Sequence, residues 1–110
     1  MDGDEVLQAL DELEVALARN DERAALMRAR AEVLRERRAR GDSWRAIVEE
    51  EAPPLVVQLV TSSAEALHDA GGRLRRAEAR ALHADGLSMD AIARHFGVTR
   101  QRISALLRER

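Results

Sequence analysis

The chain has no cysteine, no lysine and no tyrosine, and its only aromatic residues are Trp44 and Phe96. Without cysteine, disulfide bonds and thiolate metal sites are excluded. No apolar run approaches the ~20 residues that a membrane-spanning helix needs. The first residues, MDGDEV, are acidic and do not resemble a signal peptide, so we expect a cytoplasmic protein.

The residues that are plentiful are strong helix formers. Alanine, leucine, arginine and glutamate dominate, and 35% of the 110 residues are charged. We therefore predict an all-α protein of about seven helices, with an N-terminal helical hairpin, central helices and a C-terminal tri-helical helix-turn-helix. The predicted helices span 4–18, 22–40, 44–51, 54–70, 73–85, 89–96 and 99–109.

Breaks in the apolar pattern set these boundaries. RND at 19–21 interrupts the first apolar face, which includes Leu10 and Leu17, and Asn20 or Asp21 can cap a second helix. The pair Gly71–Gly72 is predicted to end the most apolar helix, which contains LVVQLV. That segment could pass for a strand, but the chain offers no second strand to pair with it.

The stretch GLSMDAIARHFGVTRQR, residues 86–102, has the pattern of two helices locked by a tight turn. Ser88 is the expected N-cap of the first helix, and Thr99 that of the second. Gly97 occupies the turn, where a left-handed backbone favours glycine. Apolar residues are predicted to lock the crossing; they are Ile92, Ala93, Phe96, Val98, Ile103, Leu106 and Leu107.

This packing turns the opposite face of the second helix outward. Arginine pairs with guanine and glutamine with adenine through two hydrogen bonds in the major groove, whereas hydroxyl groups and helix N-termini suit phosphates. Arg102 is placed toward the flank, where it would touch the DNA backbone. The candidate DNA-binding residues are Ser88, Thr99, Arg100, Gln101, Arg102, Ser104 and Arg108.

Residues 73–110 resemble the tri-helical DNA-binding module of bacterial regulators. The pattern G-x-S-x-x-x-I-A-x-x-F-G-V-T-R is similar to the promoter −35-reading module of primary sigma factors and to the helix-turn-helix of DNA invertases and resolvases. The resemblance implies that Thr99, Arg100, Gln101, Ser104 and Arg108 contact DNA. It covers about a third of the chain, so neither promoter melting nor recombination is implied.

The balance of charge also changes at residue 73, where the resemblance begins. Residues 73–110 carry nine arginines against four acids, whereas residues 1–72 carry nine arginines against sixteen acids. We therefore predict a support and self-association region at 1–72 and a DNA-binding module at 73–110. A homodimer could read a palindrome. The apolar helix 54–70 could be core or could pair with a second copy, and RERRAR (35–40) could be a phosphate patch or a solvated helix end.

The segment 41–48 is a near-copy of 86–93. Both read G-x-S-x-x-A-I, with Trp44 in place of Met89 and Ile47 in place of Ile92. Residues 41–70 are either a degenerate helix-turn-helix or a chance likeness between two capped helices. The three glutamates after it, Glu49 to Glu51, would repel phosphates, so only the C-terminal copy is expected to touch DNA.

Nothing in the sequence indicates catalysis. There is no glycine-rich phosphate loop and no His-x-x-x-His pair, and His68, His83 and His95 are isolated. We expect a non-enzymatic, sequence-specific transcription regulator without cofactor or metal, whose partner is double-stranded DNA. The alternative is a protein-interaction adaptor or antitoxin-like module that acts on RNA polymerase or another protein.

Overall fold

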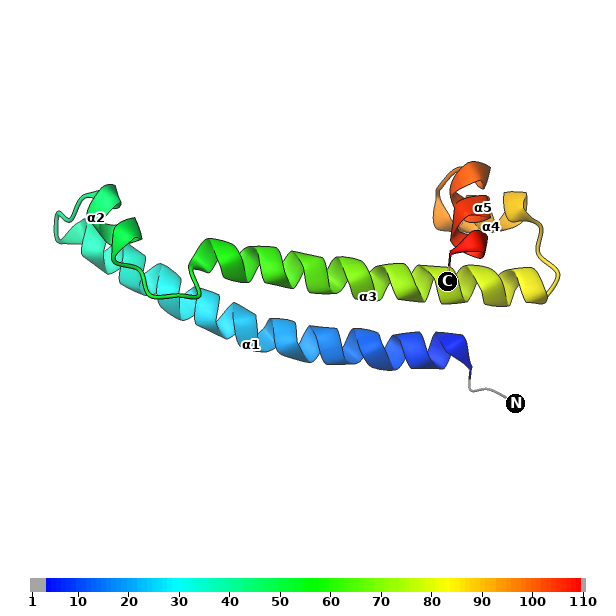
Figure 1. The fold of residues 1–110 in the computed structure, drawn as a ribbon, viewed down its shortest axis with the longest axis horizontal. Helices are drawn as coiled ribbons and strands as arrows, with labels where there is room; N and C mark the ends of the chain where they lie inside the picture. The colour runs from blue at the N-terminus through cyan, green and yellow to red at the C-terminus, as the bar shows by residue number, and fades with distance from the viewer. Residues whose placement is uncertain (1–3, 110) are drawn as a thin grey trace. The chain divides into compact units, whose positions relative to one another are not determined.

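The computed structural model describes residues 4–109, which form five α-helices and no strand (Figure 1). They are α1 (Glu5–Ala39), α2 (Trp44–Glu49), α3 (Val56–Ala84), α4 (Met89–Phe96) and α5 (Arg100–Arg108). The all-α class is confirmed, whereas the predicted count of about seven helices is wrong. Between residues 4 and 109, no helix combines the length and hydropathy that a bilayer span requires.

The predicted break at residues 19–21 is absent, because α1 continues through it. No glycine or proline lies inside α1, so only Asn20 and Asp21 could have ended a helix there. Instead of capping a new helix, Asn20 donates its Nδ2 to the carbonyl of Ser63 at 3.1 Å, and its Oδ1 accepts from Arg23 at 2.7 Å. The predicted N-terminal hairpin of two short helices is therefore wrong.

The apolar face expected on the first helix, Val6, Leu10, Leu13 and Leu17, is only partly correct, since Val6 and Leu13 are half-buried. Leu10 and Leu17 are 38% and 45% exposed, whereas Ala9 is buried and Ala16 is half-buried. Ala9 and Ala16 share the inward side of α1 with the half-buried Val6 and Leu13. Leu10 and Leu17 lie beside that line and stay in contact with solvent.

The second missing break is at Gly71–Gly72, which lies inside α3. A glycine weakens a helix by about 1 kcal/mol relative to alanine but leaves its hydrogen-bond pattern intact. The preceding Ala70 is fully buried, so packing holds the helix together at this point. The predicted helix 73–85 is the end of α3, and the tri-helical C-terminus is not matched. LVVQLV (55–60) is helical as predicted from Val56 onward, where α3 begins.

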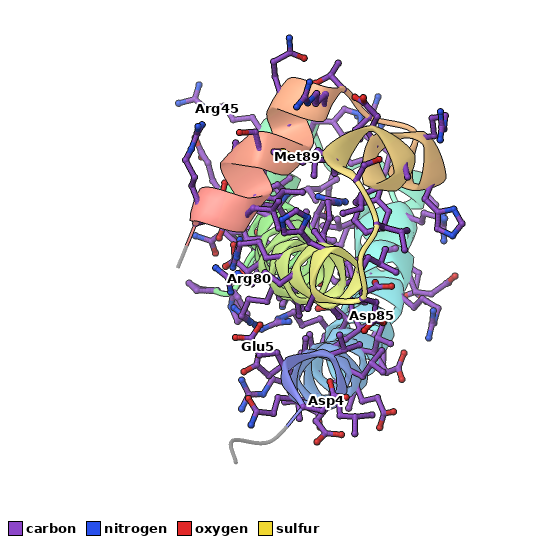
Figure 2. All side chains as sticks on the ribbon, turned by 90° about the vertical axis from the view of Figure 1, so that its right-hand side faces the viewer. Asp4, Glu5, Arg45, Arg80, Asp85 and Met89 are labelled. Carbon is purple, nitrogen blue, oxygen red and sulfur yellow. The ribbon has the colours of Figure 1, made fainter. Side chains whose placement is uncertain are left out.

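The chain divides into two compact units. The terminal unit comprises residues 1–15 and 68–110, and the central unit comprises residues 16–67. In the terminal unit, Glu5 at the start of α1 pairs with Arg80 of α3 at 3.6 Å (Figure 2). Glu12 pairs with Arg73, so the first turns of α1 run antiparallel to the second half of α3. Both α4 and α5 pack on this end of α3.

The central unit holds the rest of α1, the short helix α2 and the start of α3. The side chain of Glu51, which is 5% exposed, accepts from Arg30 at 2.7 Å and from the backbone N–H of Val56 at 2.8 Å. Arg30 also donates to the carbonyls of Ala52 and Pro54. These bonds tie the loop before α3 to α1. Within the central unit, only Ile47 and Leu59 are buried.

Candidate nucleic-acid interface

The two caps and the turn predicted around α4 and α5 are confirmed. The Oγ of Ser88 accepts from the N–H of Ala91 at 3.1 Å, and the Oγ1 of Thr99 accepts from the N–H of Arg102 at 3.1 Å. Gly97 is left-handed, with φ 68° and ψ 33°. Each hydroxyl group keeps its own hydrogen free to donate outward, so both caps retain the capacity to bind an acceptor such as a phosphate oxygen.

A buried apolar cluster fixes the crossing of α4 and α5. It comprises Ala79 from α3, Ile92 and Ala93 from α4, and Ile103 and Leu106 from α5, each 6% exposed or less. Partly buried side chains pack around it; they are Leu82, Leu87, Met89, Phe96 and Leu107. Val98 is not part of this packing, since it is 36% exposed. The prediction that Val98 closes the corner is therefore wrong.

The cluster leaves one strip of α5 directed away from the core. Successive residues of a helix are rotated by about 100°, so Gln101, Ser104 and Arg108 lie opposite the buried Ile103 and Leu106. Gln101 and Arg108 are exposed and Ser104 is half-buried. The Oγ of Ser104 accepts from Nη1 of Arg108 at 3.4 Å, which places the guanidinium along this strip.

The other two arginine candidates lie on opposite flanks of α5. Arg100 reaches toward α4 and faces Asp90 at 3.8 Å. Arg102 lies on the α3 side, where it faces Glu109 at 3.7 Å, and Glu109 also pairs with Arg76 of α3 at 3.2 Å. Carboxylates partly neutralise both flanks. The outward strip is different, because between residues 4 and 109 no ion pair involves Arg108.

A crevice of about 290 Å³ lies between α3 and α5 on the Arg102 side. Its lining residues are His68, Asp69, Gly72, Arg73, Arg75, Arg76, Arg102 and Glu109. Four guanidinium groups therefore line one crevice against two carboxylates. The arginines of α3 were not among the candidate residues, although the positive balance of residues 73–110 includes them. Only the packing of α5 on α3 brings them beside Arg102.

The arginines of RERRAR are occupied by contacts within the central unit. Arg37 pairs with Asp42 at 2.8 Å and with Glu50 at 2.6 Å, and these hydrogen bonds raise the pKa of its guanidinium above the usual value. The guanidinium of Arg38 lies 5.4 Å from the ring centre of Trp44. Arg35 and Arg40 also face carboxylates. This segment therefore fits a helix end whose arginines stabilise the turn after α1 and the neighbouring helix α2.

Comparisons of the chain with known protein families, curated proteins and solved structures find no match. The case for a function consequently depends on the geometry of the chain itself. Among residues 4–109, no three histidine, aspartate or glutamate side chains gather where they could hold a metal ion. The surface best organised for a ligand is the outward strip of α5 with its two arginine flanks.

Proposed function

We propose that the protein is a sequence-specific double-stranded DNA-binding transcription regulator, with α5 as the helix that enters the major groove. The observation that carries the proposal is the outward strip of Gln101, Ser104 and Arg108, which a buried apolar cluster holds along a helix capped by Thr99. A rigid helix with exposed bidentate donors is what base-edge recognition requires.

The residues divide into reading and positioning roles. Arg108 and Gln101 are the candidates for bidentate bonds to guanine and adenine. Arg100 and Arg102, on the two flanks, would bind the phosphates on either side of the groove. Ser88 and Thr99 would donate to phosphates from the N-termini of α4 and α5, where the helix dipole favours an anion. Arg75 and Arg76 would extend the phosphate contacts onto α3.

A homodimer is part of this proposal. A single short recognition helix reads few base pairs, whereas two copies read two half-sites and gain specificity. The carboxylates beside Arg100 and Arg102 also weaken binding to random DNA, which makes the gain from a second copy more important.

The test is binding of the full chain to a library of random-sequence duplexes, followed by selection of the bound fraction. We expect affinity that falls steeply with salt, because bound phosphates release counterions. Arg108→Ala should weaken binding to the selected duplex about tenfold or more. Arg45→Ala is the matched control, since it removes the same charge from an arginine that is 86% exposed on α2. Absence of salt-sensitive binding to any duplex overturns the proposal.

The second candidate is a protein-interaction adaptor or antitoxin-like module, with RNA polymerase as one possible partner. The observation that favours it is the set of large apolar side chains exposed in the central unit, among them Trp44 and Val57. Co-purification from the native host separates the two. A stoichiometric protein partner, together with no affinity for DNA, would favour the adaptor.

A further inference from the structure

The central unit exposes more large apolar side chains than it buries. Its buried residues are Ile47 and Leu59, while eight large apolar residues are at least 45% exposed. These are Leu17, Leu26, Val33, Trp44, Val48, Val57, Val60 and Leu67. Contiguous apolar surface on a small unit marks an interface, because water around it is costly.

Three of these residues, together with the exposed Ala64, form one stripe on α3. Val57, Val60, Ala64 and Leu67 follow one another at spacings of three, four and three residues, which places them on a single face of the helix. The hydroxyl of Thr61, beside this stripe, donates to the carbonyl of Val57 at 3.0 Å. Its hydrogen is thus bonded within α3, and the methyl group adds to the apolar surface.

The geometry points to an antiparallel homodimer in which this α3 stripe packs against the same stripe of a second copy. The inference specifies the homodimer of the proposed function, but it does not require that the protein bind DNA. The spacing of the stripe is the same in both directions. A two-fold axis at the level of residue 62 would therefore set Val57 against Leu67 of the partner copy, and Val60 against its Ala64.

The charge pattern favours a second copy over another occupant. No charged residue lies between Glu51 and Glu65, although 35% of the chain is charged. Glu65 lies one turn beyond Thr61 at one border, but the four stripe residues themselves carry no charge and offer no counter-charge to nucleic acid or to a charged helix. An uncharged face meets no repulsion from an identical face, and the small Ala64 opposite Val60 allows the two helices to approach closely.

The first test measures the mass of the full chain by sedimentation over nanomolar to micromolar concentrations. We expect a dimer that Val60→Glu dissociates, raising the dissociation constant by roughly a hundredfold or more, because two carboxylates would meet at the interface. Val33→Glu is the matched control: Val33 is 48% exposed and lines a different apolar groove, with Leu26 and Pro54. It should leave the dimer intact, and both variants should keep the helical content of the wild type.

The second test uses the absence of native cysteine. Thr61→Cys should form covalent dimers with a short bismaleimide, because residue 61 borders the stripe. Arg45→Cys should not, since Arg45 is an exposed residue of α2 outside the stripe. A monomeric wild type, dissociation by Val33→Glu but not by Val60→Glu, or equal cross-linking at both cysteines overturns the inference. Each of these results leaves DNA binding by α5 to be decided by its own assay.

Discussion

Two corners of this chain share a local sequence and a local structure, yet they lead to different surroundings. At the end of α1, Gly41 has φ 98° and Ser43 caps α2; at the end of α3, Gly86 has φ 98° and Ser88 caps α4. Both serine caps accept at 3.1 Å. The pattern G-x-S therefore encodes a helix–turn–helix corner and not, by itself, a DNA-reading surface.

The two corners share the glycine turn and the serine cap, but they differ in the contacts that hold the helix after the cap. The α2 corner is held by charged groups, because Arg37 pairs with Asp42 and Glu50, and α2 stops after six residues. The α4 corner is held by the apolar cluster around Ile92, and Gly97 then directs the chain into α5. At the second corner, the basic helix α5 can expose its outer face because its inner face packs in this apolar cluster.

The largest expected effect tests the difference in packing. Ile92→Ala should lower the free energy of unfolding by about 3 kcal/mol, since it leaves a cavity in the cluster. Ile47→Ala, at the equivalent place in the α2 corner, should cost less, because Ile47 lies outside that cluster. Chemical denaturation measures both, with Val48→Ala as an exposed control. A larger loss for Ile47→Ala would refute the contrast.

The next effect tests the similarity of the two corners. Gly41→Ala and Gly86→Ala should each cost about 1–2 kcal/mol, since both glycines have positive φ. Gly71→Ala should have the opposite sign and stabilise by up to about 1 kcal/mol, because it lies within α3, where an added Cβ meets no atom within 4 Å. Thermal unfolding reports all three. Destabilisation by Gly71→Ala would argue for a break at that position.

A pH titration distinguishes the charged region from the apolar one. The hydrogen bond from the N–H of Val56, with the contact to Arg30, lowers the pKa of Glu51. This stabilisation is present above the ordinary carboxylate pKa and is lost as pH falls through the lowered one. Glu51→Ala should cost about 1 kcal/mol at neutral pH and flatten the acid limb of stability against pH. An unchanged acid limb contradicts this role.

The smallest effect compares the two serine caps. Ser43→Ala and Ser88→Ala should each cost about 0.5–1 kcal/mol, because each leaves one helix N–H without its acceptor. Glycine at either position should restore most of the loss. Hydrogen exchange of α2 and of α4 locates each effect. Unequal costs would show that the surroundings, and not the cap, dominate at one corner.

Local patterns in the sequence predicted the C-terminal pair of helices, α4 and α5, well. The bounds of α4, the caps at Ser88 and Thr99 and the turn at Gly97 are all confirmed, because each depends on residues within one turn of the chain. The candidate reading residues fall on exposed or half-buried positions of α5, although Arg100 and Arg102 lie on its flanks. Their contacts with DNA remain a prediction.

The predictions that failed involve residues far apart in the sequence. Asn20 stays inside α1 because its side chain bonds to Ser63, and Gly71 stays inside α3 beside the buried Ala70. At both positions, packing against another helix outweighs the low helix propensity of the residue. Likewise, no local pattern indicated that Glu109 would pair with both Arg76 and Arg102.

The sequence by itself determined the helical class, the two glycine turns with their serine caps, and the apolar residues that pack α5 against α4. These features arise from backbone preferences and side-chain bonds over a few residues, which any context preserves. The tertiary structure alone decided how many helices there are, which leucines and valines stay exposed, and which arginines meet carboxylates. Those outcomes depend on helix pairing across tens of residues, where small local preferences are outweighed by burial and by ion pairs.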